Sequence, residues 1–146
     1  MLAFLRAMVG PDDAEDCFQE TFIAAMRAYD DMDGRHPRAW VMTIARRKAI
    51  DHHRARARRA VPSEDVPEIA APPATGGLGD LGGEVWSAVA ELSDAQRSAV
   101  ALRYAGDLAY REIATALEIS EDAARRRVAD GLRALRESVN REEAVR

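Results

Sequence analysis

The sequence predicts an all-α fold made of two small helical domains joined by a flexible linker. Apolar residues recur at helical spacing in both halves of the chain, which is rich in Ala, Leu, Arg and Glu and shows no strand pattern. Between the halves, residues 61–83 hold four of the six prolines and five of the nine glycines without a periodic apolar pattern, which is typical of a linker. We therefore expect domains over residues 1–60 and 84–146.

The composition also limits the class of protein. No apolar run approaches the ~20 residues that a membrane helix needs, and acidic "PDDAED" follows "MLAFLRAMVG" where a signal peptide would carry small residues for cleavage. The one cysteine, Cys17, cannot form an internal disulfide, and no Cys/His cluster has the spacing of metal ligands. We expect a cytoplasmic protein with no metal or other cofactor and no membrane contact, in which Cys17 serves packing.

The N-terminal domain is predicted as a three-helix lobe, and two of its helices have clear signals in the sequence. Pro11 begins the first, and the spacing of Asp12 and Glu15 resembles a capping box. The residues expected to form its buried stripe are Phe18, Phe22, Met26 and Tyr29. After the break "DDMDGRHP", Pro37 begins a second helix with a cationic face. The apolar face expected on that helix is Trp40, Val41, Ile44, Ala45 and Ile50.

The C-terminal domain is predicted to contain a helix-turn-helix. Ser93 caps the helix "SDAQRSAVALRYAG", which Gly106 ends. A short helix over "YREIATALEIS" then leads, through a tight break, to Ser120 as the N-cap of a longer helix. The residues expected to pack these last two helices together are Ile113, Ala114, Leu117 and Ile119, against Ala124, Val128, Leu132 and Leu135.

The net charge of −4 conceals blocks of opposite sign. Residues 1–34 carry eight acids and two arginines, whereas residues 35–60 carry nine Arg or Lys and one acid. Because salt screens charges beyond roughly 8–10 Å, a polyanion meets the local cationic block and not the average. "DHH", residues 51–53, could suggest catalysis, but adjacent helical residues point about 100° apart and cannot converge on one atom. We expect a nucleic-acid partner, no small-molecule substrate and no enzyme activity.

Two stretches in order resemble one family. "DAEDCFQETFIAAMRAY" with "PRAWVMTIARRKAIDHHRARARR" is similar to region 2, and "LSDAQRSAVALRYAGDLAYREIATALEISEDAARRRVADGLRAL" to region 4, of the extracytoplasmic-function (ECF) sigma factors of the sigma-70 family. Together they cover about two-thirds of the chain. The resemblance implies a transcription initiation factor that binds core RNA polymerase, with region 2 reading and melting the -10 promoter element and region 4 reading the -35 element. In the family, about twenty further residues ahead of "LAFLRAMVG" form the first helix of region 2, so the resemblance implies that the domain over residues 1–60 is truncated at its N-terminus. It also implies an anti-sigma factor as a further partner.

The resemblance assigns residues to three surfaces. The polymerase-binding residues it implies are Asp13, Glu15, Asp16, Gln19, Glu20 and Phe22. Those implied for the single-stranded -10 element, with a flipped base held near "YDDMDGRHP", are Asp33, Arg38, Trp40, Arg46, Arg47 and Lys48. Those implied for the -35 duplex are Tyr110, Arg111, Glu121, Asp122, Arg125, Arg126 and Arg127.

Simpler interpretations stay open beside these assignments. The acids of the first helix also suit its dipole and its solubility, an indole at the position of Trp40 is more often a core residue, and Glu121 with Arg125 also fits an i,i+4 ion pair. Glu118 stands where the family's turn has glycine, and residues 122–124, Asp-Ala-Ala, replace glycine-threonine-valine. The alternative functions are a helix-turn-helix regulator that acts without polymerase, and a truncated sigma-like protein that binds polymerase or an anti-sigma partner without initiating.

Overall fold

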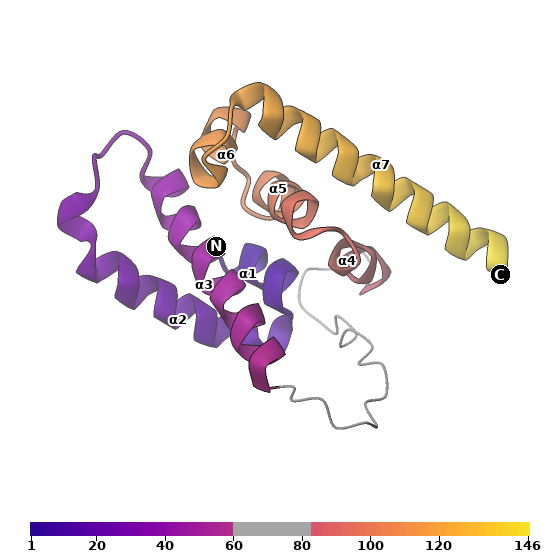
Figure 1. Cartoon of the computed structure of the whole chain (residues 1–146), viewed down its shortest axis with the longest axis horizontal. Helices are drawn as coiled ribbons and strands as arrows, with labels where there is room; N and C mark the ends of the chain where they lie inside the picture. Colours follow the sequence, from indigo (N-terminus) through magenta and orange to yellow (C-terminus); the bar gives the residue numbers. More distant parts are fainter. Residues whose placement is uncertain (60–82) are drawn as a thin grey trace.

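The computed structural model describes residues 1–59 and 83–146, which form two lobes (Figure 1). The N-terminal lobe consists of α1 (Leu2–Val9), α2 (Pro11–Arg27), the 3-10 turn η1 (Tyr29–Asp31) and α3 (Pro37–Arg59). The C-terminal lobe consists of α4 (Gly83–Ala90), α5 (Asp94–Tyr104), α6 (Tyr110–Leu117) and α7 (Glu121–Val145). The predicted all-α fold is confirmed, while the predicted linker lies outside the described residues except for Gly83. Of the helices described, none is long and apolar enough to span a bilayer.

The N-terminus of α2 differs from the predicted capping box. Pro11 occupies the first turn as expected, but Gly10 precedes it with φ 85° and no side chain caps the helix. A glycine adopts this left-handed backbone without the steric cost of a Cβ atom. Asp12 and Asp13 lie in the first turn, where their charge complements the helix dipole.

The buried faces of α2 and α3 consist of smaller residues than predicted. The buried residues of α2 are Ala14, Cys17, Thr21 and Ala25, and those of α3 are Ala39, Met42, Ala45 and Ala49. The predicted stripe of α2 is wrong, because Phe18 is only half-buried and Phe22, Met26 and Tyr29 are exposed. On α3 only Ala45 of the predicted face is fully buried. Helices that pack closely leave room for small side chains at the contact, so the larger residues lie beside it.

The helix-turn-helix is confirmed in its caps and its packing. The hydroxyl oxygens of Ser93 and Ser120 accept hydrogen bonds from the N–H groups of Gln96 and Ala123, at 3.3 and 3.1 Å. Of the eight apolar residues expected to join α6 to α7, five are buried and three are half-buried. The left-handed residue after α5 is Asp107, with φ 53°, and not Gly106. Glu118 ends α6 with φ 55° and ψ 45°, as its position in the turn requires.

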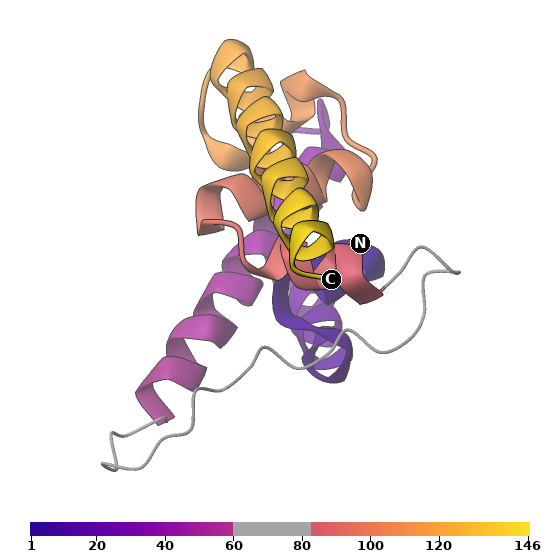
Figure 2. The ribbon, with the colours of Figure 1, turned by 90° about the vertical axis from the view of Figure 1, so that its right-hand side faces the viewer.

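The two lobes share one hydrophobic core, which the sequence did not predict. Its buried residues come from both lobes and include Leu5 and Met42 of the first and Leu102 and Ile113 of the second. Helix α3 packs on α6 and α1 packs on α5. Figures 1 and 2 show that α2 and α7 lie on opposite sides of the molecule, with the other helices between them. The side of α2 away from α1 and α3 is therefore left uncovered by the C-terminal lobe.

Burial makes Cys17 a weak nucleophile. Its side chain is 2% exposed, and burial, followed by the carboxylate of Glu20, raises the pKa of the thiol to about 11. We expect Cys17 to react with a thiol reagent at pH 8 roughly a hundredfold more slowly than an exposed cysteine introduced by Arg141→Cys, because fewer thiolates are present. The unsubstituted protein gives the rate of Cys17, and the additional fast-reacting equivalent of the Arg141→Cys variant gives the rate of the exposed thiol. Equal rates for the two thiols would contradict the burial of Cys17. Because the folded pKa is raised, the thiol stabilises the fold below pH 9, and that contribution is lost as the pH rises through about 11.

The close contact of α5 with α7 depends on a glycine. A Cβ atom on Gly131 would lie 2.6 Å from Cγ2 of Val100, which is itself 4% exposed. Although Gly→Ala favours an isolated helix by about 1 kcal/mol, we expect Gly131→Ala to lower the free energy of unfolding by about 1–3 kcal/mol through overpacking. Urea unfolding measures the change. The double variant with Val100→Ala should lose less than the sum of the two single losses; a more stable Gly131→Ala protein would disprove the contact.

Candidate polymerase and promoter interface

The acidic residues of α2 form a face that points to solvent. Glu15, Asp16, Gln19 and Glu20 are all exposed, and the opposite side of the helix packs on α1 and α3. Thr21 lies on the buried side, where its hydroxyl donates a hydrogen bond to the carbonyl of Cys17 at 2.6 Å. The buried hydroxyl is therefore satisfied. Four of the six predicted polymerase-binding residues therefore share one open acidic surface.

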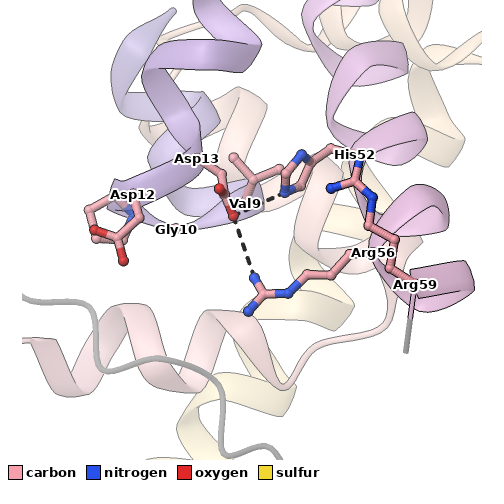
Figure 3. A pocket seen from close by; sticks show the side chains of 8 residues that line it. Val9, Gly10, Asp12, Asp13, His52, Arg56 and Arg59 are labelled. Atoms are coloured by element: carbon pink, nitrogen blue, oxygen red, sulfur yellow. Dashed lines mark hydrogen bonds and ion pairs between the residues drawn. The ribbon is translucent and has the colours of Figure 1, made fainter. Parts of the chain in front are cut away.

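Asp13 is placed differently from the other predicted polymerase-binding acids. Its carboxylate lies 3.0 Å from Nε2 of His52 and 3.4 Å from the guanidinium of Arg56, so it joins α2 to α3 (Figure 3). The three side chains line a pocket of about 260 Å³ together with Val9, Gly10, Pro11, Asp12 and Arg59. The neighbouring His53 contacts the carbonyl of Met8 through Nε2 at 2.6 Å. The histidines of "DHH" thus tie helices together within the lobe.

An apolar surface continues the acidic face toward the C-terminus of α2. Phe22, Ile23, Met26 and Tyr29 are 47%, 50%, 76% and 64% exposed. The ring of Phe22 lies 4.9 Å from that of the half-buried Phe18, measured between centroids. Only Phe22 was assigned to the polymerase surface from the sequence. The sequence predicts Met26 and Tyr29 in the buried stripe, because their helical spacing fits a core face equally well, and it assigns Ile23 to neither surface. The packing of α1 and α3 on the opposite side of the helix leaves all three exposed.

Two arginines of α3 contact the C-terminal lobe. The guanidinium of Arg38 donates to the carbonyls of Gly106 and Asp107 at 3.0 and 3.1 Å, and Arg47 lies 3.7 Å from Glu118. The half-buried Arg46 has its Nε atom buried without a hydrogen-bond acceptor among the described residues. Desolvation, followed by the charge of Arg127, lowers the pKa of Arg46. Arg38 and Arg47, two of the six predicted single-strand residues, thus contact the helix-turn-helix lobe.

The remaining residues predicted for the -10 element differ in their exposure. Trp40 and Lys48 are half-buried on α3. Asp33 is exposed in the loop before α3, where its carboxylate accepts the N–H of Arg35 at 3.0 Å and shapes the turn. Trp40 is therefore neither a full core residue nor a fully exposed aromatic surface.

Side chains at the start of α7 hold Arg125 in place. Its guanidinium lies 2.7 Å from Glu121, 3.8 Å from Asp122 and 5.2 Å from the centre of the Tyr110 ring. Arg103 lies 4.7 Å from the centre of that ring as well. Cation–π contacts of this kind orient guanidinium groups. The predicted i,i+4 pair thus exists, and it positions Arg125 at the outer surface of the helix-turn-helix.

The other arginines of the predicted duplex surface differ in their exposure. Arg111 and Arg126 are exposed, and Arg126 makes no ion pair with any residue of the described ranges. Arg127 is half-buried and lies close enough to Arg46 for their charges to interact. Arg125 and Arg126 therefore share an outward surface, while Arg127 belongs to the contact between the lobes. Within residues 1–59 and 83–146, no three His, Cys, Asp or Glu side chains are grouped so that they could hold a metal ion.

Comparisons with known proteins agree with the two-lobe arrangement. The family model for sigma-70 region 2 matches residues 1–59, and that for sigma-70 region 4 matches residues 82–135. The ECF RNA polymerase sigma factor SigK of Mycobacterium ulcerans is 30% identical over 133 residues, which cover 84% of this chain and 70% of SigK. The ECF RNA polymerase sigma factor SigF of Caulobacter vibrioides is 35% identical over 141 residues, covering 94% of this chain and 78% of SigF.

Solved structures support the same assignment. The sigma factor RpoE of Bartonella quintana, in complex with the anti-sigma factor NepR, superposes with a TM-score of 0.75 at 28% identity, covering 95% of this chain and 89% of RpoE. CnrH, in complex with the cytosolic domain of CnrY, superposes with a TM-score of 0.68 at 24% identity, covering 95% of this chain and 80% of CnrH, and shows the shared fold alone. The two family regions occur here in order on one all-helical chain. The chain therefore belongs to the ECF RNA polymerase sigma factors of the sigma-70 family.

Proposed function

We propose that three surfaces of this chain divide the work of a sigma factor. The protein is a transcription initiation factor that binds core RNA polymerase and directs it to promoters. The observation that carries the proposal is the separation of charge: one exposed face of α2 is acidic, whereas the exposed arginines of α7 and the cationic side of α3 lie on other parts of the molecule. Polymerase and DNA can then each meet a surface of opposite charge.

Polymerase binds the exposed face of α2. The acids Glu15, Asp16 and Glu20 suit a basic partner surface, and the exposed Phe22 and Met26 beside them supply apolar area that is desolvated on binding. Charge complementarity raises the association rate and the specificity, while the apolar residues contribute more to the lifetime of the complex. Asp13 acts mainly within the lobe, because its carboxylate already contacts His52 and Arg56.

The start of α7 reads the -35 duplex. The first residues of the second helix of a helix-turn-helix reach base edges in the major groove. Arg125, held by Glu121 and Tyr110, is oriented for a bidentate contact with a base, and Arg126 is free to contact phosphate. Arg111, at the start of α6, is exposed for a further phosphate contact.

The cationic face of α3 binds the melted -10 strand. Arg38, Arg46 and Arg47 supply the charge for a single-strand groove, and Trp40 and the loop with Asp33 flank it. A base that has left the duplex binds this surface, whereas a paired base does not, so binding stabilises the melted state over the closed duplex. Melting therefore requires no catalytic group. We propose that the protein acts in the cytoplasm as a transcription factor without enzyme activity. We also propose that an anti-sigma factor binds it, as NepR binds its relative RpoE.

Reversing a charge on α2 separates polymerase binding from DNA binding. We expect Asp16→Arg to weaken association with core RNA polymerase at least roughly tenfold, because a cation then faces the basic partner surface. Duplex binding should not change, since α2, which carries Asp16, lies on the opposite side of the molecule from α7 (Figure 1). Glu137→Arg, an equal reversal at an exposed position on α7, is the control for polymerase binding. Pull-down with core polymerase measures the first affinity, and a mobility shift with duplex DNA measures the second. An affinity for polymerase that Asp16→Arg leaves unchanged would refute the assignment of α2 to polymerase binding.

The salt dependence of duplex binding tests the role of Arg126. A phosphate contact releases about one counterion, so Arg126→Ala should reduce the slope of log affinity against log salt by about one for any double-stranded sequence. Arg136→Ala, at an exposed position further along α7, is the matched control and should leave the slope unchanged. Titration of a fluorescent DNA duplex at several salt concentrations measures both. An unchanged slope for Arg126→Ala would exclude the phosphate contact.

A further inference from the structure

The ring of Tyr110 joins three helices of the C-terminal lobe. Tyr110 is the first residue of α6 and packs, half-buried, against the hydrophobic core. The guanidinium of Arg103, in the last turn of α5, lies 4.7 Å from the centre of this ring, and that of Arg125, on α7, lies 5.2 Å from the same centre. The sequence assigns Arg103 to none of the three surfaces, whereas the structure places it against the same ring as Arg125.

Arg103 is fixed from the inside of the lobe. Its half-buried guanidinium donates to the carbonyl of Leu108 at 2.9 Å. Leu108 is a fully buried residue of the connection between α5 and α6, so the acceptor belongs to the rigid part of the lobe. A cation over an aromatic face is attracted to the ring. Because the hydrogen bond fixes the guanidinium, that attraction in turn favours one orientation of the Tyr110 ring.

Arg125 is held more loosely and is open to DNA. Its side chain is 53% exposed, and its ion pair with Glu121 is the shorter of its two carboxylate contacts, at 2.7 Å. The Tyr110 ring gives this long side chain a further point of attachment. A side chain that is ordered before binding loses less conformational entropy when it meets its partner. A bidentate contact with a base requires one orientation of the guanidinium plane, whereas attraction to phosphates depends mainly on charge.

We propose that Arg103 is a positioning residue for recognition of the -35 element: through the ring of Tyr110 it orients Arg125 and so strengthens the preference for one base pair. This inference rests on the proposed base contact of Arg125. The groups act in series, because Leu108 fixes Arg103, Arg103 orients the ring, and the ring with Glu121 orients Arg125. Loss of Arg103 therefore lowers discrimination between base pairs more than affinity for DNA in general.

The base preference of the full chain bound to core RNA polymerase tests the proposal. Duplexes selected from a random-sequence DNA library identify the base pair at which Arg125→Ala loses its preference. Affinities are then measured for the selected duplex and for the same duplex with that base pair changed. Arg103→Gln should reduce the ratio of the two affinities roughly two- to tenfold, which corresponds to about 0.5–1.4 kcal/mol for ordering one side chain. A partly unfolded variant loses both affinities alike, so an unchanged ratio would overturn the proposal.

Two controls separate the ring from charge and from the tyrosine hydroxyl. Arg136→Gln removes the same charge at an exposed position of α7 and should leave the ratio unchanged; equal reductions in both arginine variants would mean a general charge effect and would count against the proposal. Tyr110→Leu should reduce the ratio as Arg103→Gln does, while Tyr110→Phe keeps the ring and should retain the preference. A loss in Tyr110→Phe as large as that in Tyr110→Leu would assign the effect to the hydroxyl and contradict the positioning role.

A double variant tests whether Arg103 acts through Arg125. In the Arg125→Ala background, Arg103→Gln should not reduce the ratio further, and additive losses would refute the series. Failure of the two ideas can be told apart. If Arg125→Ala keeps every base preference, the base contact of Arg125 fails and the positioning role falls with it. If Arg125→Ala loses a preference that Arg103→Gln keeps, the base contact stands and the positioning role fails.

Discussion

The packing of α3 on two sides is the constraint on which the rest of the structure depends. Its buried residues, Ala39, Met42, Ala45 and Ala49, are mostly small, so helices of both lobes approach it closely. Helix α3 packs on α1 and α2 of its own lobe and on α6 of the C-terminal lobe. Larger side chains at these positions would push one partner away, since overpacked helix contacts are destabilising. The short alanine-rich stripe thus sets where the cations of α3 can lie.

Because α3 is covered twice, its charges divide by position along the helix. Near its start and middle, Arg38 and Arg47 meet the C-terminal lobe. Near its end, His52 and Arg56 meet Asp13 of α2. A block of cations that appears uniform in the sequence therefore serves three purposes: contact between lobes, contact within the N-terminal lobe, and solvent exposure for the last turns. From the net charge alone, the whole cationic block would be assigned to DNA binding.

The local features of the fold could be predicted from the sequence, and the contacts between distant segments could not. Ser93 and Ser120 cap helices as expected, because a capping hydroxyl acts on a backbone three residues away. Glu118 is left-handed as the turn requires. The stripe of α2 was predicted wrongly because periodicity shows that residues share a face but not which face is covered. The joining of the lobes depends on contacts such as that of Arg38 with Asp107, 69 residues apart, for which no local pattern exists.

The three proposed surfaces differ in how far the fold exposes them. The acidic face of α2 lies open, because its opposite side packs on α1 and α3. Arg125 and Arg126 at the start of α7 are exposed as well. On α3, by contrast, Arg38 donates to the carbonyls of Gly106 and Asp107 and Arg46 is half-buried. Because charge acts on a polyanion over only about 8–10 Å, the exposed cations of α3, and not its whole cationic block, set the field that DNA meets there.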